Sequence, residues 1–115
     1  MCFKKIRNYF QNNKKAVKTK EDKELVEMNS KTVESLIVLA KENEMIVAKL
    51  KSLQETIRYL IASGDPKVMD YDKKIRNLLQ DLRIALTKSD GQNSKKIDDI
   101  LVDLDVAIAD RKTRI

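Results

Sequence analysis

The fold is decided by residues 25–60, which read LVEMNSKTVESLIVLAKENEMIVAKLKSLQETIRYL. Mostly apolar residues recur in this stretch at alternating spacings of four and three, as on the face that amphipathic helices bury when they pack together. These seam positions are Leu25, Asn29, Thr32, Leu36, Leu39, Asn43, Ile46, Leu50, Leu53, Ile57 and Leu60. The 115 residues include only 2 Gly and 1 Pro, too few for the turns of a many-stranded sandwich or barrel. The sequence therefore predicts an all-α protein.

Start and stop signals around this stretch indicate three helices. A first helix is expected over residues 20–62, where Gly64 can take the conformation that closes it. Asp65 and Pro66 start a second helix as N-cap and first helical residue, and the polar loop 89–94 precedes a third. The residues expected inward on the last two helices are Val68, Tyr71, Ile75, Leu78, Leu79, Leu82, Ala85, Leu86, Ile97, Ile100, Leu101, Leu104 and Ile108.

The lengths of these helices leave apolar surface uncovered. At a rise of 1.5 Å per residue the first helix extends about 65 Å, roughly twice either of the others. Short connections make neighbours antiparallel, so the second and third helices cover only residues 38–62. Either the first helix breaks, near 29–30 or 41–43, and folds back as a fourth helix, or a second chain covers its N-terminal half. In the second case the partner-helix contacts are Leu25, Val33, Leu36, Ile37 and Leu39. The predicted architecture is an antiparallel bundle of three helices, or of four, with a long first helix.

Polar residues at the seam and at the helix ends are assigned from spacing alone. Asn43 fits two interpretations equally, a buried residue that sets the register of packed helices or a residue facing water at a bend, and Asn29 is expected to face water. Asp72 is expected to pair with Arg76, four residues later on the same helix. Arg111 is expected among the cations of the last turn of the third helix.

The net charge of +6 is concentrated in the first 20 residues. This segment holds seven cations and no acid, so the rest of the chain is nearly neutral and its charges are expected to be a solvated exterior. We therefore divide the chain into a basic amphipathic N-terminal arm, residues 1–19, and a helical-bundle domain, residues 20–115. The arm also holds both phenylalanines of the chain, which a core would normally contain.

The arm has the pattern of a helix that lies on a membrane surface. In helical geometry Phe3, Ile6 and Phe10 fall on one face, with cations beside and opposite them. The same cations can neutralise the phosphates of nucleic acid, and a solubilising tail or docking on the bundle itself remain alternatives. The residues expected to contact a membrane or another polyanion are Phe3, Lys4, Lys5, Ile6, Arg7, Phe10, Lys14, Lys15, Lys18 and Lys20.

The composition argues against catalysis and metal binding. There is no His, the single Cys is Cys2, and 2 Gly do not build a phosphate-binding loop. The aspartates of the third helix are spread around it, as on a solvated face rather than in a calcium site; they are Asp98, Asp99, Asp103, Asp105 and Asp110. We expect no enzyme activity, no catalytic residue, no metal, no cofactor and no small-molecule substrate.

Targeting signals are not evident in the sequence. Cations interrupt the apolar residues of the first segment, so it does not resemble a secretory signal, and the longest apolar run, residues 36–40, is too short to span a bilayer. A lone thiol suits a reducing compartment, so a cytoplasmic protein is expected, either free or peripheral at the inner face of the membrane. The functional hypothesis is a helical-bundle interaction protein that self-associates or binds a partner helix, with an arm that docks on an anionic membrane. The alternative is a nucleic-acid-binding accessory protein that uses the same arm.

Overall fold

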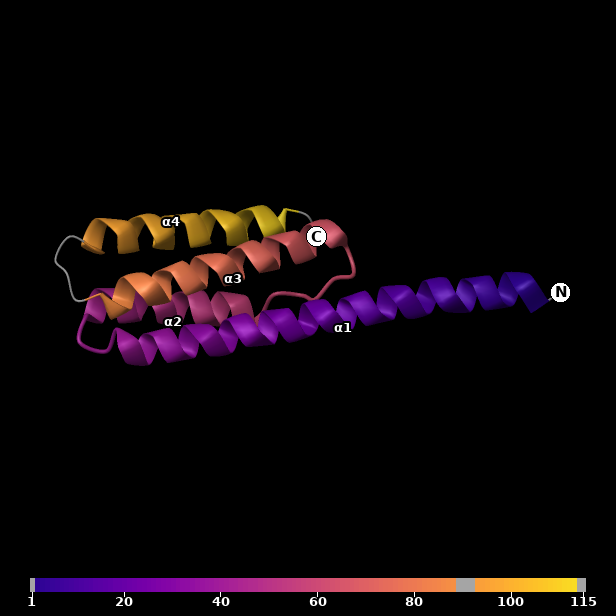
Figure 1. Ribbon diagram of the computed structural model, residues 1–115, viewed down its shortest axis with the longest axis horizontal. Helices are drawn as coiled ribbons and strands as arrows, with labels where there is room; N and C mark the ends of the chain where they lie inside the picture. The colour runs from indigo at the N-terminus through magenta and orange to yellow at the C-terminus, as the bar shows by residue number, and fades with distance from the viewer. Residues whose placement is uncertain (1, 89–92, 114–115) are drawn as a thin grey trace.

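The structure is a computed structural model that describes residues 2–88 and 93–113, with side chains described for 17–88 and 94–113. It contains four helices: α1 (Cys2–Leu39), α2 (Glu44–Arg58), α3 (Pro66–Thr87) and α4 (Asn93–Lys112). The helices run up and down in sequence order and form a bundle, beyond which the N-terminal part of α1 extends (Figure 1). No strand occurs in the described ranges. The all-α prediction is confirmed.

The first predicted helix is broken at residues 40–43, and its second half folds back as α2. Asn43 is the N-cap of α2, with φ −111° and ψ 97°, and its side-chain oxygen accepts the N–H of Ile46 at 3.2 Å. A capped break is favourable because it satisfies a free amide at the helix start and lets the two halves of the apolar seam pack on each other. The arrangement of three helices is thus corrected to four, by the first of the two alternatives.

The remaining boundaries follow local signals. Helix α2 ends at Arg58, whereas the sequence predicted that this helix ends at residue 62. The connection to α3, residues 59–65, is therefore longer than expected. Asp65 caps α3 as predicted: its carboxylate accepts the N–H of Lys67 at 2.9 Å, and Pro66 occupies the first turn. Part of the predicted loop, 89–92, lies outside the described residues.

The core lies between all four helices and is built from Leu, Ile, Val and Ala. On α1 the buried stripe follows Val26, Val33, Leu36 and Ala40. The buried residues that the other helices contribute to this core are Leu50, Leu53, Ile57, Ile75, Leu79, Leu82, Ala85, Ile97, Ile100, Leu101, Leu104, Ala107 and Ile108. Helix α1 packs on α2 and α3, α3 packs on α4, and α2 only touches α4, so that α1 and α4 are diagonal.

The apolar residues proposed as contacts for a partner helix mostly have partners within the chain. Leu25, Val33 and Leu36 are buried, and Ile37 is half-buried against the core. Leu39 is 48% exposed at the end of α1. The reason is the break at residues 40–43, which brings α2 over the half of α1 that a straight helix would leave bare.

Candidate functional site

The N-terminal arm lies at the start of α1. Helix α1 runs without a break through the boundary proposed between residues 19 and 20. Lys18 and Lys20 are exposed, whereas the side chains of Phe3, Lys4, Lys5, Ile6, Arg7, Phe10, Lys14 and Lys15 lie outside the described residues. Of the side chains that are described, the first buried one is Asp22. Among the described side chains, the core and the buried polar contacts therefore begin at residue 22.

An ionic network is buried at the end of the bundle from which the arm extends. Its centre is Arg111, which has no exposed surface although the sequence placed it in a solvated last turn. Arg111 Nε donates to Asp72 Oδ1 at 2.7 Å and Nη2 to Asp72 Oδ2 at 3.2 Å. The same Nη2 lies 3.3 Å from Asp22 Oδ2 and 2.9 Å from the carbonyl oxygen of Ile61, to both of which it donates. The predicted pairing of Asp72 with Arg76 is wrong, because Asp72 faces the core.

Two further contacts join this network to the α2–α3 connection and to α1. The backbone N–H of Ser63 donates to Asp22 Oδ2 at 2.7 Å. Asn29 Nδ2 donates to the backbone oxygen of Asp72 at 3.1 Å, and Asn29 is 1% exposed, so the expectation that it faces water is wrong. We call Asp22, Asn29, Asp72 and Arg111 the buried network. It connects α1, α3, α4 and residues 61–63, elements that are far apart in the sequence.

The buried network has more acid than base. Two carboxyl groups share one guanidinium, and both are fully buried with it. Desolvation by burial raises the pKa of Asp72 to about 7; the neighbouring Asp22 adds to this shift and Arg111 opposes it. Among the described side chains, Asp22 Oδ1, Asn29 Oδ1 and Arg111 Nη1 have no hydrogen-bond partner. Asp72 is therefore protonated below about pH 7, which leaves one acid fewer to oppose Arg111, and it ionises as pH rises above this value.

The protein should lose stability as pH rises from about 4 to about 7. The pKa of Asp72 is raised from 3.8 to about 7 in the folded state, so between these values the folded state binds more protons than the unfolded state. The contribution of Asp72 is thus complete at acidic pH and is lost as pH rises through its folded pKa. No His is present to mask the effect. Urea unfolding followed by circular dichroism at several pH values measures it.

Matched variants assign this pH dependence to one carboxyl group. Asp72→Asn cannot ionise and should flatten the curve of unfolding free energy against pH. Asp70→Asn, an exposed position two residues away on α3, should leave the curve unchanged. A wild type whose stability rises over this range, or an Asp72→Asn variant with the same slope, would contradict the assignment.

Sequence periodicity held a signal for the buried network. Asp22 and Asn29 continue the stripe of Val26, Val33 and Leu36 at spacings of four and three. Asp72 lies in the same way between Val68 and Ile75, and Arg111 follows Leu104 and Ile108. A polar residue on an apolar stripe either lies at a helix end or is buried with a polar partner. Asp22, Asp72 and Arg111 lie on such stripes of three separate helices, and the two acids are opposite in charge to the arginine, which favours burial as partners.

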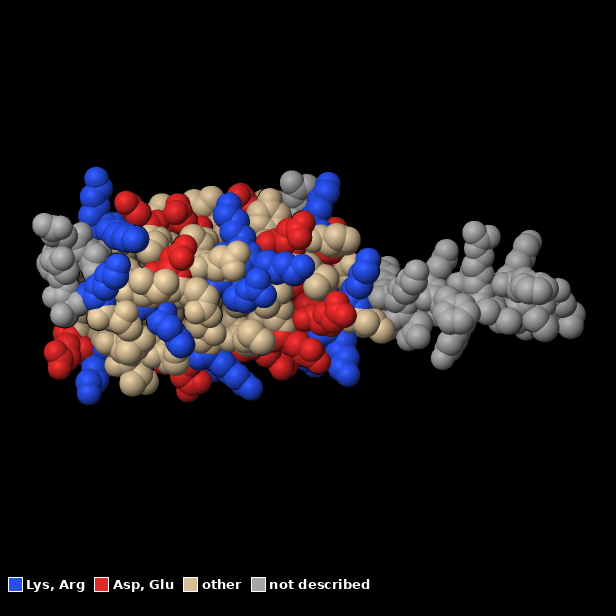
Figure 2. Space-filling model, in the orientation of Figure 1, with Lys and Arg blue, Asp and Glu red and all other residues tan. Residues whose placement is uncertain are grey.

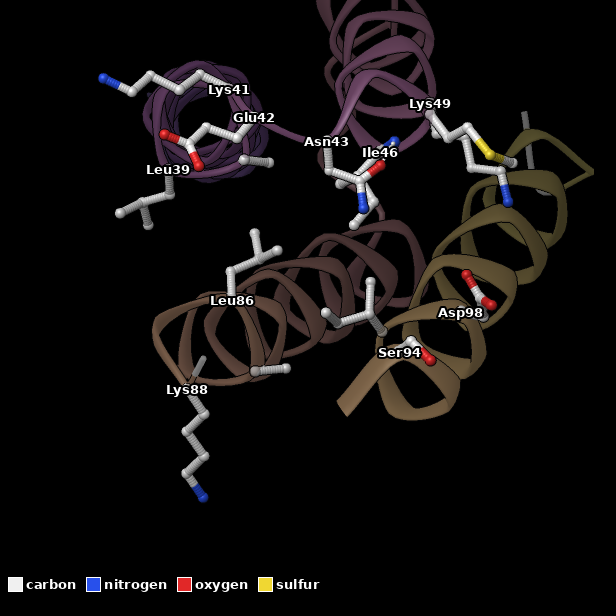
Figure 3. A pocket seen from close by; sticks show the side chains of 14 residues that line it. Leu39, Lys41, Glu42, Asn43, Ile46, Lys49, Leu86, Lys88, Ser94 and Asp98 are labelled. Atoms are coloured by element: carbon white, nitrogen blue, oxygen red, sulfur yellow. Dashed lines mark hydrogen bonds between the residues drawn. The ribbon is translucent and has the colours of Figure 1, made fainter. Parts of the chain in front are cut away.

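A hollow of about 650 Å³ lies at the opposite end of the bundle. It is bounded by the α1–α2 turn, the end of α3 and the start of α4, and Ile46 and Leu86 point into it whereas Lys41 and Lys88 point away (Figure 3). Its rim carries charges of both signs, including Lys49 and Asp98. This mixed rim does not favour one class of ligand.

The face of the bundle seen in Figure 2 carries interspersed charges of both signs. Among the described helices, none is long and apolar enough to cross a membrane. Within the described ranges, no group of three or more potential metal-binding side chains converges. Comparisons of the sequence and structure with protein-family models, curated proteins and solved structures found no match.

Proposed function

We propose that the chain is a non-enzymatic interaction protein whose N-terminal arm docks on an anionic membrane surface. The observation that supports it is the change along α1 from exposed or half-buried side chains at residues 17–21 to a stripe of buried ones that begins at Asp22. From Asp22 onward α1 supplies the core and the buried network, whereas Val17, Lys18 and Lys20 remain exposed. The helix continues beyond the bundle toward its N-terminus (Figure 1). The side chains of Val17, Lys18 and Lys20 are thus exposed to contact with another surface.

The composition of the arm selects the kind of surface. Phe3, Ile6 and Phe10 are each worth about 1.5–3 kcal/mol when fully removed from water, and each cation near an anionic bilayer adds about 1 kcal/mol. An anionic bilayer offers charge and apolar volume together. Duplex DNA offers the charge alone unless its bases are exposed. Weak, reversible docking on anionic lipid satisfies both parts of the pattern.

Cosedimentation with vesicles tests this function. The full chain should bind vesicles of phosphatidylcholine with phosphatidylserine, and removal of residues 1–20 should abolish binding while the helical circular dichroism of the bundle persists. Phe3→Ser with Phe10→Ser should weaken binding by at least about tenfold, because apolar insertion is lost. Tyr59→Ser is the matched control. Tyr59 is 74% exposed on the bundle, and its replacement should leave vesicle binding unchanged.

The same preparations distinguish the nucleic-acid alternative. Both kinds of binding weaken with salt, but only lipid binding should depend on the two phenylalanines more than on ionic strength. A chain that ignores anionic vesicles at low salt and binds duplex DNA tightly would replace the membrane proposal with the nucleic-acid one.

A further inference from the structure

Helix α4 presents an apolar stripe to solvent on the side opposite the core. Val102 and Val106 are 58% and 52% exposed, and Ala109 is exposed with them. At 3.6 residues per turn these three positions fall within a sector of about 60°. The core residues of α4, such as Leu104 and Ile108, lie on the far side of the helix. We call Val102, Val106 and Ala109 with the acids beside them the outer face of α4.

Aspartates border this stripe on both sides. By helical periodicity Asp98 and Asp105 lie along one side, and Asp99, Asp103 and Asp110 lie along the other. All five are exposed. From residue 97 to residue 110 the sequence contains no Lys or Arg. An apolar stripe between two acidic borders fits an amphipathic helix whose own apolar stripe has cations beside it.

The chain itself contains a segment with that complementary pattern. In residues 1–20 Phe3, Ile6, Phe10 and Val17 follow helical spacing, with seven cations and no acid in the same segment. In a helix, residues 1–20 and the 20 residues of α4 each extend about 30 Å. Charge, apolar spacing and length therefore match between the arm and the outer face of α4.

The arm of the same molecule is poorly placed to reach this face. Helix α1 is diagonal to α4 in the bundle, with α2 and α3 between them. It is also a single helix that continues away from the bundle (Figure 1). Docking on its own α4 requires α1 to break and turn around the bundle, next to Asp22 of the buried network. A second copy can present its α4 to the arm without any such break.

We propose that residues 1–20 of one copy pack along the outer face of α4 of a second copy, and that the second copy returns the contact. The valine stripe contacts the apolar face of the arm, and the aspartates contact its cations. This inference goes beyond membrane docking and does not depend on it, because the association is measured in buffer without lipid.

Sedimentation equilibrium with exchanged charges tests the contact. The wild type should form a dimer that weakens as salt rises, and removal of residues 1–20 should leave a monomer. One variant carries Asp99→Lys, Asp103→Lys and Asp110→Lys; the other carries Arg7→Glu, Lys14→Glu and Lys18→Glu. Each alone should dimerise at least about tenfold more weakly, because its three exchanged side chains then face side chains of like charge. An equimolar mixture of the two should recover the dimer, because the exchanged side chains of each arm or face then meet side chains of opposite charge on the other copy.

Two control variants separate the outer face from general charge effects. Glu24→Lys with Glu27→Lys and Glu34→Lys makes the same charge change on exposed positions of α1 and should not change the dimer constant. Val102→Thr with Val106→Thr keeps the shape of the stripe, removes apolar surface and should weaken the dimer. Far-UV circular dichroism confirms that each variant is folded.

Three results would overturn the proposal. A wild type that is monomeric at low salt excludes the contact. In a second case, the mixture of the two exchanged variants stays monomeric while a single chain that carries all six changes has an arm protected from proteolysis. That pair of results places the arm on the α4 of its own chain. A dimer that survives removal of residues 1–20 uses a different surface. Each result is independent of whether the arm binds vesicles.

Discussion

Arg111→Met is expected to lower the free energy of unfolding by about 3–5 kcal/mol at neutral pH, because it removes one partner from a fully buried ionic group. Methionine keeps much of the volume of arginine and removes the charge and all of its donors. Asp22 and Asp72 then remain buried beside each other, and the carbonyl of Ile61 loses the guanidinium that donates to it at 2.9 Å. Urea unfolding followed by circular dichroism measures the loss, which should be smaller at acidic pH, where Asp72 is protonated.

Companion variants separate the lost charge balance from the change of shape. Lys112→Met alters an exposed cation on the adjacent position and should change stability by less than about 0.5 kcal/mol. Adding Asp22→Asn and Asp72→Asn to Arg111→Met removes the unbalanced charges and should recover much of the loss, since breaking a buried pair costs more than replacing it whole. If Arg111→Met costs no more than Lys112→Met, the buried network does not stabilise the protein in solution.

Local signals in the sequence were sufficient for the helix class and for the start of α3. Asp65 and Pro66 act within one turn of chain, so their roles as N-cap and first helical residue do not depend on tertiary contacts. Val68, Ile75, Leu79 and Leu82 repeat at helical spacing on a single helix, and that repeat predicted their burial correctly.

The break between α1 and α2 was not determined by local signals. Asn43 fits a seam position in a long helix and is also a favoured N-cap residue, so its identity alone does not decide between the two. The choice depends on whether the apolar half of α1 finds a partner within the chain. Folding back buries Leu36 against the bundle, together with Leu50 and Ile57 of α2, and that gain is visible only when all helices are placed together.

The buried network was missed for a related reason. Arg111 near the end of its helix is favoured by the helix dipole, and Asp72 lies four residues before Arg76 on one helix, so the local interpretation of each was self-consistent. Their burial follows from three helices meeting at one end of the bundle, where Asp22 supplies the second acid. The arm, by contrast, was recognised from composition, because no core or cap in the bundle needs its six cations.

Leu82→Asp is expected to cost more than about 4 kcal/mol and to leave the bundle largely unfolded. Leu82 has no exposed surface and lies in the apolar core, so a carboxylate there has no cation among its core neighbours. Single domains of this size have total stabilities of about 5–15 kcal/mol, so a loss of this size removes most of the margin. Thermal melting followed by circular dichroism measures the expected loss of the cooperative transition.

Two variants on the same helix show whether charge or missing volume causes the loss. Ile84→Asp places the same carboxylate two residues away, where the side chain is 51% exposed, and should change stability by less than about 1 kcal/mol. Leu82→Ala removes volume without adding charge and should cost about 2–5 kcal/mol. Acidification should partly restore Leu82→Asp, because the protonated carboxyl is cheaper to bury, and should not restore Leu82→Ala. Equal losses in both Leu82 variants at neutral pH, with no recovery in acid, would mean that water reaches position 82 and that the core is more open than the four-helix packing implies.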